Sequence, residues 1–112
     1  MCLVVQIETP AGVAALDDIL AVEGVDALFI GPSDLSANYG HIGNPGAPEV
    51  VEAVQSSLDK IAASDKASGI MALDPAAAKS YLDRGVDFVA VSIDARTLAL
   101  SLRAIAADMR NR

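Results

Sequence analysis

Hydrophobic and polar positions along the chain define two alternating kinds of segment. Short apolar runs of strand length are each followed by a longer segment in which apolar residues recur at the spacing of an amphipathic helix. The predicted strands are Cys2–Ile7, Val25–Ile30, Gly69–Leu73 and Val86–Ile93. Strands that alternate with helices in this way are typical of a parallel sheet covered by helices. The pattern therefore predicts an α/β fold made of four βα units.

Capping residues, prolines and glycines indicate where the predicted helices begin and end. Thr9 and Asp74 each precede a proline, and Pro48 opens another helix. Gly24 and Gly85 are expected to end the first and third helices. Apolar stripes are predicted at Val13, Leu16, Ile19 and Leu20 in the first helix, at Val51, Val54, Leu58 and Ile61 in the second, and at Leu98, Leu102, Ile105 and Met109 in a last helix that starts at Asp94. A long loop is expected over Leu35–Ala47.

A faint internal repeat supports the series of equivalent units. Gly24-Val25-Asp26-Ala27-Leu28-Phe29 resembles Gly85-Val86-Asp87-Phe88-Val89-Ala90. In both copies a glycine that ends a helix is followed by the start of a strand. The repeat therefore indicates βα modules of one design.

Length and composition limit how complete this fold can be. With 112 residues, the chain is expected to form one domain over residues 1–112, whereas a closed α/β barrel usually needs about 250 residues. Only 4% of the residues are aromatic, so an aliphatic core is expected, as in parallel sheets. An open four-stranded sheet has two apolar edge strands, which other chain segments or a second copy would have to cover.

Charge and cysteine content limit which kinds of partner and which cellular compartment are expected. The net charge of −7 disfavours nucleic acid as a partner. Cys2 is the only cysteine, so no intramolecular disulfide is expected, and the residue is predicted to be a small buried side chain of the first strand. No apolar stretch approaches the ~20 residues of a membrane span, and no charged segment precedes the apolar start. A cytoplasmic protein without a membrane partner is expected.

Two acidic residues stand where the first two predicted strands end. Glu8 follows the first strand, and Asp34 follows the second. Because the carboxyl ends of parallel strands share one edge of a sheet, the two carboxylates can converge on one cation. Gln6 shares a strand face with Glu8 and can donate a hydrogen bond to it or to a ligand. With water and substrate oxygens, this set suits Mg²⁺ or Mn²⁺ better than zinc.

The turn before Asp34 offers a second kind of contact. Gly31 allows close backbone approach and Pro32 fixes φ, so the N–H groups of Ser33 and Asp34 can face an anion. The structural alternatives stay open: Glu8 as a solvated turn acid, and Asp34 as the cap of a short segment at Leu35.

The remaining polar candidates favour structural roles. His41 lies in a glycine-rich loop and is expected to be a surface histidine. Asp74 and Asp94 each precede a helix and are expected to cap it. Ser92 has no His or Lys nearby in the sequence, so a nucleophilic role is not expected.

Four sequence segments carry a family resemblance. Residues 5–9 read Val-Gln-Ile-Glu-Thr, 20–26 Leu-Ala-Val-Glu-Gly-Val-Asp, 29–36 Phe-Ile-Gly-Pro-Ser-Asp-Leu-Ser and 43–50 Gly-Asn-Pro-Gly-Ala-Pro-Glu-Val. Together they resemble the HpcH/HpaI aldolase family. The resemblance covers the whole chain, but only the carboxyl-terminal half of the family's (β/α)₈ TIM barrel, with strands five to eight. Residues 91–96 depart from the family's usual Val-Gly-Val-Asp-Thr-like run.

The resemblance implies a metal-dependent class II pyruvate aldolase, a lyase that cleaves 4-hydroxy-2-oxo acids to pyruvate and an aldehyde. On the matching positions, Glu8 and Asp34 would bind Mg²⁺ or Mn²⁺, with Co²⁺ as a third candidate. Gln6 would polarise the bound oxo acid, and the backbone of Ser33 and Asp34 would receive the pyruvate carboxylate. The family's arginine and proton-transfer histidine belong to the missing amino-terminal half. No catalytic residue of that kind is therefore expected in this chain.

Two other interpretations remain. The chain could be a non-catalytic half-barrel, whose partner would be a second copy in a homo-oligomer or a complementary amino-terminal half. A flavodoxin-like binding domain is disfavoured because no glycine-rich phosphate turn follows the first strand.

Overall fold

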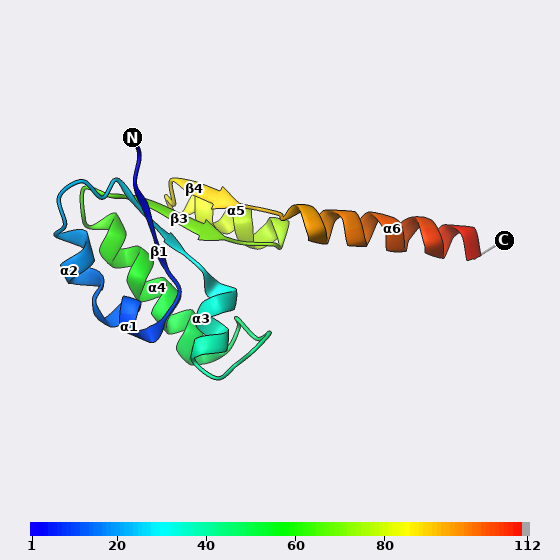
Figure 1. Ribbon diagram of the computed structural model, residues 1–112, viewed down its shortest axis with the longest axis horizontal. Coiled ribbons are helices and arrows are strands. Elements are labelled where there is room, and N and C mark those ends of the chain that lie inside the picture. The colour runs from blue at the N-terminus through cyan, green and yellow to red at the C-terminus, as the bar shows by residue number, and fades with distance from the viewer. Residues whose placement is uncertain (111–112) are drawn as a thin grey trace.

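Four parallel strands in chain order form the sheet of the computed structural model, which describes residues 1–110 (Figure 1). They are β1 (Val4–Ile7), β2 (Ala27–Ile30), β3 (Ala67–Met71) and β4 (Phe88–Ala90). The helices are α1 (Pro10–Ala14), α2 (Leu16–Leu20), α3 (Pro32–Asn38), α4 (Pro48–Ala62), α5 (Pro75–Asp83) and α6 (Asp94–Arg110). The predicted α/β fold of four βα units is confirmed.

The predicted helix boundaries follow the capping chemistry. Thr9 Oγ1 accepts a hydrogen bond from Gly12 N at 3.0 Å, and Asp74 Oδ2 accepts one from Ala77 N at 2.8 Å. Gly24 and Gly85 have φ of 88° and 91°, a left-handed conformation that glycine adopts without steric cost. Gly85 directly follows Arg84, the C-cap of α5, so its predicted role is confirmed, whereas α2 already ends at Leu20 and the prediction that Gly24 ends this helix was wrong.

Several predicted elements differ from those observed, and the third strand, predicted over Gly69–Leu73, lies at Ala67–Met71. The single helix expected after β1 is two, α1 and α2, because the backbone leaves helical geometry at Ala15, with ψ of 8°. The loop predicted over Leu35–Ala47 was wrong in its first part, since α3 continues to Asn38. The strand predicted over Val86–Ile93 pairs only at Phe88–Ala90, where β3 provides partners.

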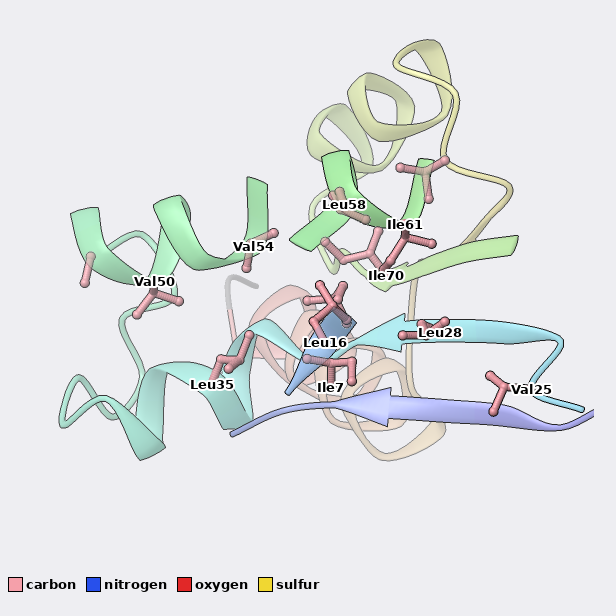
Figure 2. Packing of buried hydrophobic residues seen from close by; sticks show 13 residues of the cluster. Ile7, Leu16, Val25, Leu28, Leu35, Val50, Val54, Leu58, Ile61 and Ile70 are labelled. Carbon is pink, nitrogen blue, oxygen red and sulfur yellow. The ribbon is translucent and has the colours of Figure 1, made fainter. Parts of the chain in front are cut away.

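The hydrophobic core lies between the sheet and α4 (Figure 2). Ile7, Leu28, Ile30 and Ile70 from the strands meet Val50, Val54, Leu58 and Ile61 from α4, and all of these side chains are buried. Burying a side chain of this size contributes about 1.5–3 kcal/mol. The α4 stripe begins at Val50, not at the predicted Val51, because a 3.6-residue period that contains Val54 and Leu58 places Val50 on the same face. Val51 is exposed.

The internal repeat corresponds to a repeated hydrogen bond. Asp26, before β2, accepts a hydrogen bond from Leu3 N at 2.7 Å. Asp87, before β4, accepts hydrogen bonds from Ser68 N at 2.7 Å and from Ser68 Oγ at 3.0 Å. In each copy the aspartate therefore ties the start of its own strand to the start of the preceding strand.

The opposite face of the sheet carries a row of side chains in register. Gln6, Phe29, Gly69 and Phe88 are paired in turn across the four strands. The rings of Phe29 and Phe88 stack with centroids 5.7 Å apart. A Cβ at Gly69 would lie 2.3 Å from the Phe88 ring and 2.8 Å from the Phe29 ring. The missing side chain of Gly69 is therefore what allows the two rings to meet.

The two ends of the described chain are the least covered parts. Helix α6 extends away from the sheet and buries none of its residues, so Leu98, Leu102, Ile105 and Met109 are exposed (Figure 1). Cys2 is exposed, contrary to the prediction, because it precedes β1, which starts only at Val4. Among residues 1–110, no helix has the length and apolar character needed to cross a membrane.

Candidate functional site

Glu8 and the first turn of α3 lie at the same edge of the sheet. Ile7 and Ile30 are paired in the parallel register, and Gly31 N donates a hydrogen bond to Ile7 O at 3.0 Å. Glu8 is the residue after Ile7, and Asp34 belongs to the turn that follows Ile30. The carboxyl ends of β1 and β2 thus form a small rim, to which the sequence-predicted residues Gln6, Glu8, Ser33 and Asp34 all belong.

The absence of a side chain at Gly31 makes room for two of these residues. A Cβ at this position would lie 3.2 Å from Gln6 Nε2, 3.3 Å from Glu8 Cβ and 3.6 Å from Glu8 Oε2. The amide of Gln6 and the carboxylate of Glu8 therefore occupy neighbouring positions over the backbone of Gly31. This agrees with their expected position on one face of β1.

Ser33 and Asp34 occupy the first turn of α3, which begins at Pro32 and has no side-chain cap. Leu35 N is the first amide of this turn to find a helical acceptor, at Gly31 O, 2.9 Å away. The amides of Ser33 and Asp34 donate no hydrogen bond to another described residue. Such N–H groups at the start of a helix are available to an oxygen ligand.

The carboxylates of Glu8 and Asp34 are likewise without protein partners in the described part of the chain. Neither accepts a hydrogen bond or forms an ion pair there, although Glu8 is half-buried and Asp34 is exposed. Within residues 1–110, no group of three or more His, Cys, Asp and Glu residues could hold a metal ion. Carboxylate oxygens such as these are the type of ligand that hard cations prefer, and Mg²⁺ commonly keeps water or substrate oxygens as its further ligands.

Asn38 belongs to this rim and was not singled out from the sequence. Its Nδ2 donates hydrogen bonds to Glu8 O at 3.1 Å and to Asp34 O at 2.9 Å. The only signal in the sequence is an asparagine one helical turn after Asp34, because the contact with Glu8 spans 30 positions. Such a contact depends on the tertiary fold.

The other polar candidates lie outside the rim or serve local structure. His41 Nε2 pairs with the carboxylate of Glu49 at the start of α4. Asp74 caps α5 as expected, whereas Asp94 is the first residue of α6 and not its cap, and its Oδ1 accepts a hydrogen bond from Ala95 N. Ser92 Oγ lies 2.7 Å from Thr97 Oγ1 and contacts no basic side chain in the described chain.

An apolar cavity of ≈ 250 Å³ lies near the rim, at the carboxyl end of β3. Its lining residues come from the start of α3, the loop before α4, the end of β3 and helix α5: Pro32, Ser33, Pro45, Met71, Ala72, Leu73, Asp74, Ala77 and Tyr81. Ser33 is shared between this cavity and the rim.

A four-stranded parallel sheet in chain order, with a helix after each strand, is the arrangement of consecutive units in a barrel of the (β/α)₈ class. The model of the HpcH/HpaI aldolase/citrate lyase family matches residues 1–100. The chain belongs to this family, which confirms the resemblance seen in the sequence.

Individual relatives agree with this assignment. The chain is 52% identical to a hydroxypyruvate/pyruvate aldolase from Pseudomonas aeruginosa over 95% of its own length and 40% of that protein. It is 48% identical to a 4-hydroxy-2-oxo-heptane-1,7-dioate aldolase from Salmonella paratyphi B, over 96% and 41% of the two chains. The crystal structure of a family member from Burkholderia cenocepacia superposes with a TM-score of 0.89 at 36% identity, over 98% and 43%. The chain thus spans about two fifths of the length of these relatives.

Proposed function

We propose that this chain supplies the metal-binding half of a class II pyruvate aldolase that cleaves 4-hydroxy-2-oxo acids to pyruvate and an aldehyde. The observation that supports this most strongly is the rim, where the carboxylates of Glu8, just after β1, and Asp34, in the first turn of α3 after β2, have no hydrogen-bond or ion-pair partner among the described residues. The family membership and the names of the relatives point to the same chemistry.

Each rim residue has a proposed role. The carboxylates of Glu8 and Asp34 hold a divalent cation, Mg²⁺ or Mn²⁺ with Co²⁺ as a third candidate. Gln6 donates a hydrogen bond to the oxo acid, and the amides of Ser33 and Asp34 donate to its carboxylate. The cation, when bound, supplies Lewis-acid stabilisation of negative charge on the substrate.

The metal site is tested by calorimetric titration of the purified chain with Mn²⁺. The unaltered chain is expected to bind one ion, and Glu8→Gln to abolish binding because one of two protein carboxylates is lost. Glu23→Gln is the matched control, since Glu23 is an exposed acid next to Gly24, before the amino end of β2. Equal binding by the unaltered chain and by Glu8→Gln would refute the site.

The proposal also predicts little or no aldolase activity for the isolated chain, because the chain supplies only the metal-binding half. No arginine or histidine of the described residues reaches the rim through a hydrogen bond or an ion pair, and His41 pairs with Glu49 instead. Missing transition-state contacts of this kind each cost about 10²–10⁴-fold in rate. Pyruvate release from a 4-hydroxy-2-oxo acid with Mn²⁺ is the measurement. Robust turnover by the isolated chain would contradict the proposal.

The second candidate function is a non-catalytic half-barrel that self-associates or complements an amino-terminal half. It is favoured by the exposed apolar residues on the uncovered face and edges of the sheet, where Val4 is 45% and Phe88 38% exposed. The two candidates are distinguished by mixing the purified chain with a second polypeptide, the part of the Pseudomonas aeruginosa relative that lies outside the matched region. Appearance of pyruvate aldolase activity that Glu8→Gln removes supports the first; association without activity supports the second.

A further inference from the structure

Asn38 provides a side-chain link between the segments that carry the two rim carboxylates. Its Nδ2 donates to Glu8 O at 3.1 Å, just beyond the end of β1, and to Asp34 O at 2.9 Å, within α3. Both hydrogens of the side-chain amide are therefore used, one on each ligand-bearing segment. No other side chain among residues 1–110 makes a hydrogen bond that joins Glu8 to α3.

The position of the Glu8 carbonyl matters because it defines the peptide plane between Glu8 and Thr9. Together with the preceding Ile7–Glu8 peptide, that plane sets the direction in which the Glu8 side chain leaves the backbone. The last ladder contact before it, Gly31 N to Ile7 O at 3.0 Å, holds Ile7 and not Glu8. The chain then turns at once into α1, which Thr9 caps. Within residues 1–110, the hydrogen bond from Asn38 is the only one that the Glu8 backbone makes.

We propose that Asn38 is a positioning residue, which holds the Glu8 end of β1 against α3 and thereby sets the separation of the Glu8 and Asp34 carboxylates. This inference rests on the proposed function for its consequence in metal binding. Cation sites demand close positioning of their ligands, and residues that orient ligands typically affect metal affinity by about 10–100-fold. Asn38 acts here through the backbone and contacts no cation itself.

The side chain of Asn38 is exposed, so it can be changed without opening a cavity in the core. Asn38→Ala removes both donors, while Asn38→Gln keeps them on a longer stem. Ser64→Ala is the matched control: Ser64 Oγ donates to Ile61 O at 2.7 Å just after the end of α4, a bond that holds no part of the rim. All three variants are expected to keep the far-ultraviolet circular dichroism of the unaltered chain.

Two measurements on these variants test the proposal. In calorimetric titration with Mn²⁺, Asn38→Ala is expected to raise the dissociation constant by about tenfold; Asn38→Gln should recover most of the affinity, and Ser64→Ala should be unchanged. In metal-free nuclear magnetic resonance, the order parameters of the Glu8 and Thr9 amides are expected to fall in Asn38→Ala and not in Ser64→Ala.

The outcomes separate this inference from the proposed function. If the unaltered chain binds no Mn²⁺, the metal site is refuted, and the order parameters alone decide whether Asn38 holds the Glu8 segment. Unchanged order parameters at Glu8 and Thr9 in Asn38→Ala would overturn the inference. It would also be overturned if the unaltered chain binds Mn²⁺ and Asn38→Ala binds it within about twofold of the same affinity, given the tenfold effect expected for a positioning residue.

Discussion

At the scale of single residues, the sequence indicated which side chains stand at the rim but not what holds them. Glu8 and Asp34 were predicted from their places after two apolar runs, because parallel strands end at one edge. The space over Gly31 and the hydrogen bonds of Asn38 depend on contacts between residues far apart in the chain. Local sequence patterns do not predict such contacts. The prediction that Cys2 is buried was wrong for a related reason, since the burial of a residue near a strand end depends on which other parts of the chain cover it.

The hydrogen bonds to Asp87 have a consequence for acid stability. Hydrogen bonds from the backbone and the side chain of Ser68 lower the pKa of Asp87 below its usual value of 3.8. A carboxyl group whose pKa is lower in the folded state contributes stability that is present above the unfolded pKa and is lost as the pH falls through the folded pKa.

We therefore expect Asp87→Asn to lower the free energy of unfolding at pH 5–7 and to lose this disadvantage as the pH falls below about 4. Urea unfolding of both chains between pH 7 and pH 3 is the measurement, with Asp83→Asn as a control for a charge removed at the end of α5. A difference between Asp87→Asn and the unaltered chain that stays constant over this range would contradict the assignment.

At the scale of elements, the helix starts at Pro10, Pro48 and Pro75 could be predicted because capping side chains and prolines act locally. The lengths of the strands could not. An apolar run continues through Val91, but a strand exists only where a neighbour provides hydrogen bonds, and β3 provides them only for Phe88–Ala90. The break at Ala15 between α1 and α2 likewise has no proline or glycine at the break itself to mark it.

Gly69 of β3 lies under the stacked rings of Phe29 from β2 and Phe88 from β4, so the packing of three strands requires the absence of a side chain at this position. Gly69→Ala is expected to destabilise the chain by about 1–3 kcal/mol, the usual cost of overpacking, because its Cβ would lie 2.3 Å from the Phe88 ring. Phe88→Leu should recover part of this loss in the double variant, since it removes the ring that collides. Urea unfolding of the two single variants and the double variant gives the coupling energy. Strict additivity of the two changes would show that the ring contact is not the cause.

At the scale of the whole molecule, the chain leaves much apolar surface uncovered. The family membership explains this in part, because the relatives are more than twice as long as the matched segment. Helix α6 buries none of its side chains in the described chain, and the edge strand β4 exposes Phe88. We expect exposed apolar surface of this kind to bind a partner.

The purified chain is accordingly expected to sediment as a dimer or larger assembly. Replacing Leu98 and Leu102 on α6 by glutamine should shift it toward the monomer, whereas Val22→Gln, which changes an exposed valine beyond the end of α2, should not. Sedimentation velocity at several concentrations is the measurement. A monodisperse monomer at all concentrations would show that these surfaces need no partner.

The central claim is that Glu8 and Asp34 share one divalent cation at the rim. Bound Mn²⁺ broadens the nuclear magnetic resonance signals of nearby nuclei, so its position can be mapped on the folded chain without any assay of activity. During titration of the ¹⁵N-labelled chain with substoichiometric Mn²⁺, the backbone amide signals of residues 6–8 and of Gly31, Ser33 and Asp34 are expected to disappear first, and Glu8→Gln should abolish this pattern. Selective loss at the acidic helix residues Asp17, Asp18, Glu49 and Glu52 instead, or uniform broadening, would contradict the account.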